Sequence, residues 1–172
     1  VRVFPLLQSN AMKKNIKGEN IIGLRLTGQP LQGASFSGQS HPKSDFSWAD
    51  LRNANFTGAD LLECVFCEAM LQGANFRGSR LKRADMTKAM MQTSNLRKAL
   101  LREARLDGAL LVGASMEGAN LQEASLQGAD LREANLRGAN LEGADLSVAD
   151  LRQAVFNEKT RWPDGFDPMD HG

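Results

Sequence analysis

The sequence predicts an all-β solenoid, a rod in which short strands wind around one axis. Three observations carry this prediction: large apolar residues recur at every fifth position, a small residue stands two places before each of them, and glycine often stands two places after. The chain has 172 residues, enough for one domain with a substantial core. Its 24% charged and 42% hydrophobic residues and its net charge of +1 argue against a disordered chain, an acidic nucleic-acid mimic and a strongly basic, histone-like protein.

The five-residue period extends from Ala34 to Phe156. The 25 positions in this range whose numbers end in 1 or 6 hold 15 Leu, 6 Phe, 3 Met and one His. Two places earlier, 20 of the 25 residues are Ala, and the residue between is mostly Asp, Asn or Ser. The repeating unit is therefore Ala-(Asp/Asn)-Leu-x-x, as in residues 129–133.

A period of five suits neither a helix nor a straight strand. In an α-helix, five residues advance by about 140°, which scatters the Leu side chains around the helix. In a straight strand, an odd period sends successive Leu side chains to opposite faces. The period works only if the chain turns a corner once per repeat, with Ala and Leu pointing inward and the residue between them facing water. Glycines such as Gly108 and Gly113 stand where such a turn needs a positive φ.

On this motif the sequence resembles the pentapeptide-repeat family, closely over residues 34–156 and loosely over residues 15–33. The resemblance implies a right-handed, four-sided parallel β-helix with four repeats, or 20 residues, in each coil, and hence about seven coils in this chain. Each central residue then stacks on the residue 20 positions away. The segment 160–168 is similar to the ending of many cyanobacterial members of the family.

We expect the chain to divide into four segments. Ser9-Asn10-Ala11 directly precedes Met12, which is typical of the remnant of a cleavable expression tag; the alternative is a native but irregular start. A solenoid must also close its open end, and Trp162 and Phe166 are the expected plugs. The expected segments are a tag remnant at 1–11, a degenerate N-terminal coil or cap at 12–33, the β-helix at 34–156 and a C-terminal cap at 157–172.

The pattern fails at residues 39–43, which read Gln-Ser-His-Pro-Lys. The repeat keeps its phase on either side, so we expect a bulged side or a small loop with His41 pushed outward. Loops on such rods can carry binding contacts. Whether this one does, or is only an irregular early coil, is left open by the sequence.

The sequence shows no catalytic constellation. Cys64 and Cys67 form a Cys-x-x-Cys pair, but the repeat register points Cys64 inward and Cys67 outward, so a redox or metal site is not expected. His41 and His171 are isolated, and the glycines follow the repeat rather than a phosphate-binding pattern. The sequence therefore predicts no enzymatic activity, no cofactor and no bound metal.

Two surface features are candidates for binding. Met70, Met90 and Leu110 stand at outward positions 20 apart, with Val112 beside them, and Leu100, Leu62 and Val65 are expected on adjoining sides. Exposed apolar stripes often mark contact sites, although local variation without a partner is an equal alternative. The second feature is a basic belt: residues 77–105 hold nine basic and two acidic residues, a net +7. The predicted contact residues are Met70, Met90, Leu110, Val112, Leu100, Arg80, Arg83, Arg97 and Arg102.

The leading hypothesis is a non-enzymatic scaffold that binds an unidentified protein partner through the sides of the rod, as a monomer or an end-to-end dimer. Nucleic-acid binding is not expected, because exposed aromatic residues do not alternate with the basic ones. No apolar run reaches the roughly 18 residues of a membrane helix, so no membrane is expected as a partner. The residues after Met12 lack the apolar core of a signal peptide, and a cytoplasmic location is therefore expected.

An alternative function comes from the family resemblance. Some pentapeptide-repeat proteins resemble B-form DNA in shape and charge, bind DNA gyrase and protect it against quinolones. Those rods are strongly acidic and dimerise through a C-terminal helix. Here the net charge is +1, the middle of the chain is basic, and the tail is rich in Pro and Gly. All three departures count against a gyrase-binding DNA mimic.

Overall fold

The chain bends at the same two positions of every five-residue repeat. The computed structural model describes residues 20–171. Within them, every fifth residue from Gly23 to Gln153 has a positive φ, and each of these residues is the third residue of a four-residue turn. This conformation belongs to type II turns, in which the amide of the fourth residue donates to the carbonyl of the first. Ala74 N, for example, donates to Leu71 O at 3.0 Å. One turn per repeat makes the chain wind instead of extending.

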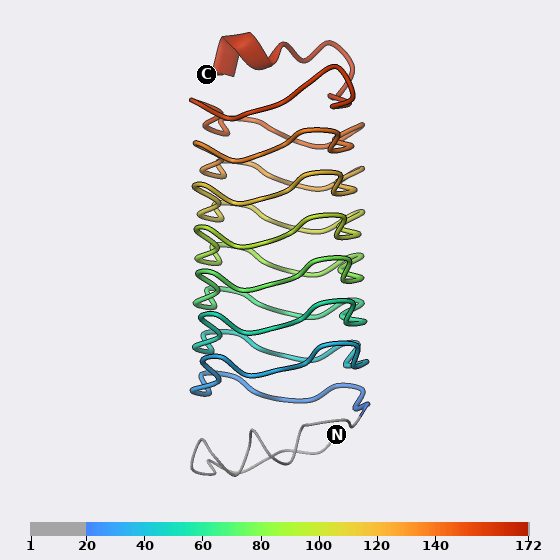
Figure 1. Cartoon of the computed structure of the whole chain (residues 1–172), viewed down its shortest axis with the longest axis vertical. Helices are drawn as coiled ribbons and strands as arrows, with labels where there is room; N and C mark the ends of the chain where they lie inside the picture. Colours follow the sequence, from blue (N-terminus) through green and yellow to red (C-terminus); the bar gives the residue numbers. More distant parts are fainter. Residues whose placement is uncertain (1–19, 172) are drawn as a thin grey trace.

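Successive coils are joined by isolated parallel β-bridges between residues 20 apart. The bridges run from Arg25↔Asp45 to Asn135↔Val155, and neighbouring bridges are five residues apart. Between them the backbone pairs continuously: Phe56 N donates to Asn75 O at 2.7 Å, and Asn75 N donates to Ala54 O at 2.9 Å. The coils therefore stack into a rod whose backbone hydrogen bonds run along its axis (Figure 1). Within the described residues there is no α-helix, and the one helical element is the short 3-10 helix η1 (Pro168–His171).

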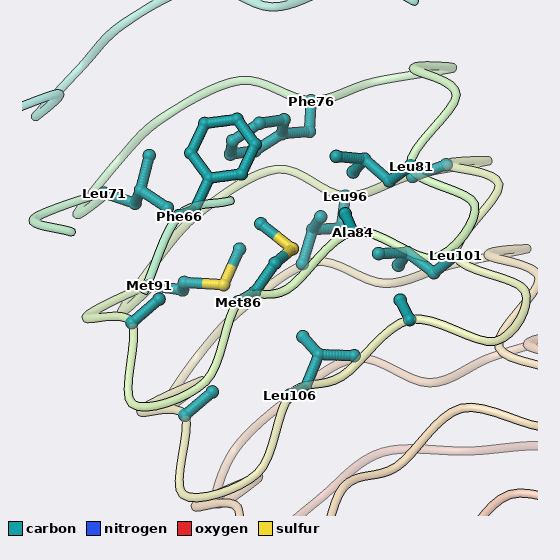
Figure 2. Packing of buried hydrophobic residues seen from close by; sticks show 14 of the residues in the cluster. Phe66, Leu71, Phe76, Leu81, Ala84, Met86, Met91, Leu96, Leu101 and Leu106 are labelled. Carbon is teal, nitrogen blue, oxygen red and sulfur yellow. The ribbon is translucent and has the colours of Figure 1, made fainter. Parts of the chain in front are cut away.

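The inward positions form one continuous core. The Ala and Leu positions of the repeats are almost all fully buried, and their side chains converge on the interior of the rod (Figure 2). Towards the N-terminus the core is aromatic: the rings of Phe56 and Phe76 stack at 4.7 Å between centroids, and Phe66 meets Phe76 edge to face at 5.7 Å. Burying each large side chain contributes about 1.5–3 kcal/mol before chain entropy is subtracted. The inward assignment of the central residues is therefore confirmed.

The expected bulge at residues 39–43 is wrong. The bridge Ser40↔Asp60 and the turn at Pro42 and Lys43 continue the repeat, and His41 is fully buried in the place of a central Leu. The core tolerates the imidazole because both ring nitrogens have hydrogen-bond partners inside the rod. Nε2 lies 2.8 Å from Gln39 Oε1, and Nδ1 accepts a hydrogen bond from the amide of Ile21 at 3.4 Å. Its ring also meets Phe36 edge to face. The segment therefore forms no loop.

The expected N-terminal segments fall only partly within the described residues. The proposed tag remnant, 1–11, and residues 12–19 lie outside them. Residues 20–33 carry the same turns as the later repeats, and bridges begin at Arg25 and Pro30.

The C-terminal end closes with a one-residue shift in register. Asn140 pairs with Arg161, 21 residues away, because one extra residue follows Phe156 before the turn at 158–159. Thr160 closes the gap by donating its hydroxyl to Leu136 O at 2.9 Å. Trp162 then meets Phe156 edge to face at 5.3 Å and stacks on Phe166 at 5.4 Å, and all three side chains pack against the core.

Candidate functional site

One outward column of the rod is apolar at its centre. We call Met70, Met90 and Leu110 the Met column, because parallel bridges join Met70 to Met90 and Met90 to Leu110. The same line of bridges continues to Asp50 on one side and Asp130 on the other, so the apolar stretch is bounded by carboxylates. Met70 and Met90 are half-buried and Leu110 is exposed. The structure therefore brings these three predicted residues together.

Uncharged side chains continue the Met column around the adjacent corner. Val112 follows the buried Leu111 and is half-buried. Gln72 and Gln92 occupy the equivalent positions in the two preceding coils, and their Oε1 atoms are buried without a hydrogen-bond partner. Because no full charge interrupts this strip, it presents the kind of surface that a partner can cover at a low desolvation penalty.

Leu100 does not belong to this surface, contrary to the expectation that it lies on an adjoining side. Leu100 forms bridges with Arg80 and Asn120. This line of bridges is offset from the Met column by ten residues, which is half of the 20 residues that separate paired positions. Side chains half a coil apart point in different directions, so the predicted contact residues form two surfaces. The relation follows from residue numbers once the 20-residue coil is known: positions that differ by 20 lie together, and positions that differ by ten do not.

The second surface is a hollow of about 320 Å³ around Leu100. Sequence reasoning did not single out Lys82 and Asn120 as members of this site. Leu62, expected like Leu100 on a side adjoining the Met column, lies half-buried in this hollow. The 20-residue interval of the coils could have identified Leu62 and Lys82 as neighbours of Arg102, because residues 62, 82 and 102 occupy the same place in three successive coils. The lining residues are Leu62, Arg80, Lys82, Leu100, Arg102 and Asn120.

The basic belt is largely paired with acids in neighbouring coils. Glu103 accepts from Arg83 Nε at 2.6 Å and lies 3.2 Å from Lys82 Nζ, and the Arg83 guanidinium lowers the pKa of the Glu103 carboxyl. Two further pairs connect coils in the same way, Arg97 with Glu117 at 2.8 Å and Arg102 with Glu123 at 2.7 Å. Counting charges over residues 77–105 misses Glu117 and Glu123, because these two acids lie beyond residue 105 in sequence but beside the belt in space. Exposed pairs of this kind contribute little stability.

The two cysteines point apart, as the repeat register predicts. Cys64 is buried and donates its thiol to His41 O at 3.0 Å, and burial raises its pKa to about 12. Cys67 is half-buried on the outward side, and burial also raises its pKa. Thiols that remain protonated at neutral pH are poor nucleophiles and poor metal ligands. Across residues 20–171, no three His, Cys, Asp or Glu side chains are placed to hold a metal ion.

The stacked coils, the parallel bridges and the filled axis define a β-helical repeat protein. The chain belongs to the pentapeptide-repeat family: it matches the family described as Pentapeptide repeats (8 copies) over residues 31–66, 62–97, 99–138 and 134–158. Proteins of this family fold as right-handed β-helices, so the predicted fold class and the predicted family are both confirmed at that level. A search of the curated proteins found no match.

Several solved structures resemble the rod. A pentapeptide repeat protein from the thylakoid lumen of Arabidopsis thaliana is 37% identical, with a TM-score of 0.57 over 58% of this chain and 69% of that one. A pentapeptide repeat protein from the cyanobacterium Nostoc is 38% identical, with a TM-score of 0.56 over 57% of this chain and 81% of that one. A plasmid-mediated fluoroquinolone resistance protein is 20% identical, with a TM-score of 0.50 over 81% of this chain and 89% of that one. At this identity the two proteins share only the fold. Among the described residues, no helix has the length and apolar character needed to cross a bilayer.

Proposed function

We propose that this protein is a non-enzymatic scaffold that binds a protein partner through the sides of a rigid β-helical rod. Its inward positions are occupied by the core, so partner recognition falls to the outward positions and the turns. The proposal includes four sides to each coil and about seven coils, supported by bridges that recur every five residues and join residues 20 apart. A rod of this kind holds its outward side chains in fixed columns, which suits a binding surface that needs little ordering on association.

The observation that carries the proposal is the Met column. Its line of bridges begins at Pro30 and also contains Asp50, Asp130 and Asp150, whereas the middle three positions are the apolar Met70, Met90 and Leu110. Methionine is flexible and polarisable and adapts to an irregular partner surface. Burying an apolar strip removes it from water at about 25 cal/mol per Å². The proposed contact residues on this surface remain Met70, Met90, Leu110 and Val112. Leu100, Arg80 and Arg102 line the hollow, Arg83 follows Lys82 of its lining, and Arg97 lines a separate hollow with Glu117.

Site-specific crosslinking tests the Met column directly. We expect a photoreactive amino acid at position 90 to form a covalent adduct with a discrete protein in an extract of the source organism. The same amino acid at position 150, on the same line of bridges but outside the apolar stretch, is the matched control and should give no such adduct. The captured protein is then purified for binding measurements. Met70→Ser, Met90→Ser and Leu110→Ser combined should weaken its binding at least about tenfold, or about 1.4 kcal/mol. Equal adducts at both positions contradict the proposal.

The gyrase-binding alternative is not adopted as the proposed function. The likeness to the fluoroquinolone resistance protein is one of fold, and Arg80, Lys82 and Arg102 gather on one face of this rod. A supercoiling assay with added protein tests the alternative, and inhibition or protection of gyrase would reinstate it. The cytoplasmic location expected from the sequence stays a prediction.

A further inference from the structure

The hollow around Leu100 combines an apolar floor with a cationic rim. Leu62 and Leu100 supply the apolar surface, and Leu100 is 46% exposed. Arg80 precedes Leu100 by one coil on its own line of bridges, whereas Lys82 and Arg102 stack in consecutive coils at the adjoining corner. The volume, about 320 Å³, lies at the lower end of the range of about 300–1,000 Å³ seen for small-ligand sites. The hollow therefore has room for a few side chains of a partner.

The rim is positively charged where it faces the hollow. Each of its three cations pairs with an acid in a neighbouring coil: Arg80 Nη1 lies 3.5 Å from Asp60, Lys82 Nζ lies 3.2 Å from Glu103, and Arg102 Nη2 lies 2.7 Å from Glu123. None of these three acids lines the hollow. Because exposed ion pairs contribute little stability, the cations can turn to a new carboxylate without a large loss. Charge complementarity thus favours an acidic ligand that also carries an apolar group.

We propose that this hollow binds an acidic segment of a partner protein, in which an aliphatic side chain is flanked by carboxylates. The aliphatic side chain packs on Leu62 and Leu100, and the carboxylates accept from Arg80, Lys82 and Arg102. A nucleic-acid strand fits the rim less well, because its bases need aromatic side chains to stack on and the lining residues include none. The inference rests on the proposed scaffold function but uses a face half a coil from the Met column.

A defined peptide tests the proposal without an extract. The probe is a fluorescein-labelled peptide with one Leu between two Asp-Glu pairs, followed by anisotropy at about 0.1 M salt, where charge interactions still act over about 10 Å. We expect saturable binding to the full chain. Replacing the peptide's Leu by Ser should weaken binding at least about fivefold, and replacing its acids by Lys should abolish binding.

Matched variants assign the binding to the hollow. Leu100→Ser and the double variant Lys82→Gln, Arg102→Gln should each weaken binding at least about fivefold. Leu110→Ser in the Met column and Arg132→Gln, which removes an exposed cation that does not line the hollow, should leave it unchanged. Circular dichroism of each variant verifies that the rod is intact.

Three results would overturn the inference: no saturable binding up to about 1 mM peptide, equal losses in the control variants, or a single-stranded oligonucleotide that binds more tightly and ignores Leu100→Ser. Each of these leaves the crosslinking result at position 90 unaffected. A failure of this inference can therefore be distinguished from a failure of the proposed scaffold function.

Discussion

His41 Nε2 lies 2.8 Å from Gln39 Oε1 inside the core of the rod. Since Gln39 Oε1 can only accept, the ring nitrogen facing it carries the proton, and Nδ1 is left to accept from the amide of Ile21. This arrangement requires the neutral imidazole, because a second ring proton would point at a donor. Burial accordingly lowers the pKa of His41 below its usual value of 6.5.

The first prediction is that the rod loses stability as the pH falls below about 6.5. Above this pH the imidazole is neutral in the folded and the unfolded chain. Below it the unfolded chain binds a proton that the folded chain does not, because the folded pKa of His41 is the lower one. The free energy of unfolding should therefore fall by up to about 1.4 kcal/mol per pH unit until the folded pKa is reached. Denaturant unfolding between about pH 7.5 and pH 5 measures this.

The double variant Gln39→Ala, His41→Leu is the control for this pH dependence. It restores the small-then-large pair found in most other repeats, and the amide of Ile21 keeps a partner because it also donates to Ser40 O at 3.0 Å. We expect its stability to change little between about pH 7.5 and pH 5. A variant as sensitive to pH as the wild type would show that other groups govern the acid response.

The second prediction uses two adjacent residues that face opposite ways. Leu101 is fully buried, whereas Leu100 is exposed. Leu101→Asp places a carboxylate in an apolar core, where it must either stay unpaired or take up a proton, so we expect an unfolded or insoluble protein. Leu100→Asp should give a soluble protein with an unchanged circular dichroism spectrum. A folded Leu101→Asp rod would contradict the inward assignment of the central residues.

The periodic part of this protein could be predicted from the sequence because it depends on local alternation. Ala and Leu two residues apart point the same way, and the next repeat repeats the geometry after a turn, so the burial of Leu101 or Leu131 follows from the period alone. Residues other than glycine also occupy the turn position with a positive φ, among them Arg83 and Glu103. The coil imposes this conformation on whatever residue stands there.

The features that the sequence missed depend mainly on neighbours in adjoining coils. His41 looks like an outward polar residue until Gln39 and Ile21 are seen to pair with it. Leu100 and Leu110 look like one patch until their different lines of bridges separate them. The basic belt, counted as nine basic and two acidic residues, looks strongly positive until Glu123 is found beside Arg102 in the next coil. Apart from the contact between His41 and Gln39, two places away, the missing information is the lateral register of one coil on the next.

The third prediction concerns strain at Val148. This residue has a φ of +52°, a backbone conformation that is unfavourable for a β-branched residue. Because Val148 is 80% exposed, burial of its side chain offsets little of this cost. Asn53 occupies an equivalent turn position with a φ of +57°. We expect Val148→Asn to raise the free energy of unfolding by about 1 kcal/mol. Val155→Asn, on a bridge and without a positive φ, is the matched control and should be neutral or destabilising. A destabilised Val148→Asn would contradict the presence of strain.

The fourth prediction concerns the C-terminal cap. Trp162 stacks on Phe166 at 5.4 Å, and both pack on a core whose last members include Leu146 and Leu151. Trp162→Ala with Phe166→Ala uncovers this apolar end. We expect the free energy of unfolding to fall by about 3–5 kcal/mol, the cost of removing one fully buried Phe or Trp, because the two side chains are each only partly buried.

The uncovered end should also associate. Exposed apolar surface at the end of a solenoid is a docking site for another uncapped end. Light scattering coupled to size exclusion should therefore show a concentration-dependent dimer of the double variant, and thermal unfolding followed by circular dichroism should show its lower stability. Met169→Ala, which removes a side chain that is 72% exposed in η1, should change neither measurement. A double variant that melts and elutes like the wild type would show that the two aromatic residues do not cap the rod.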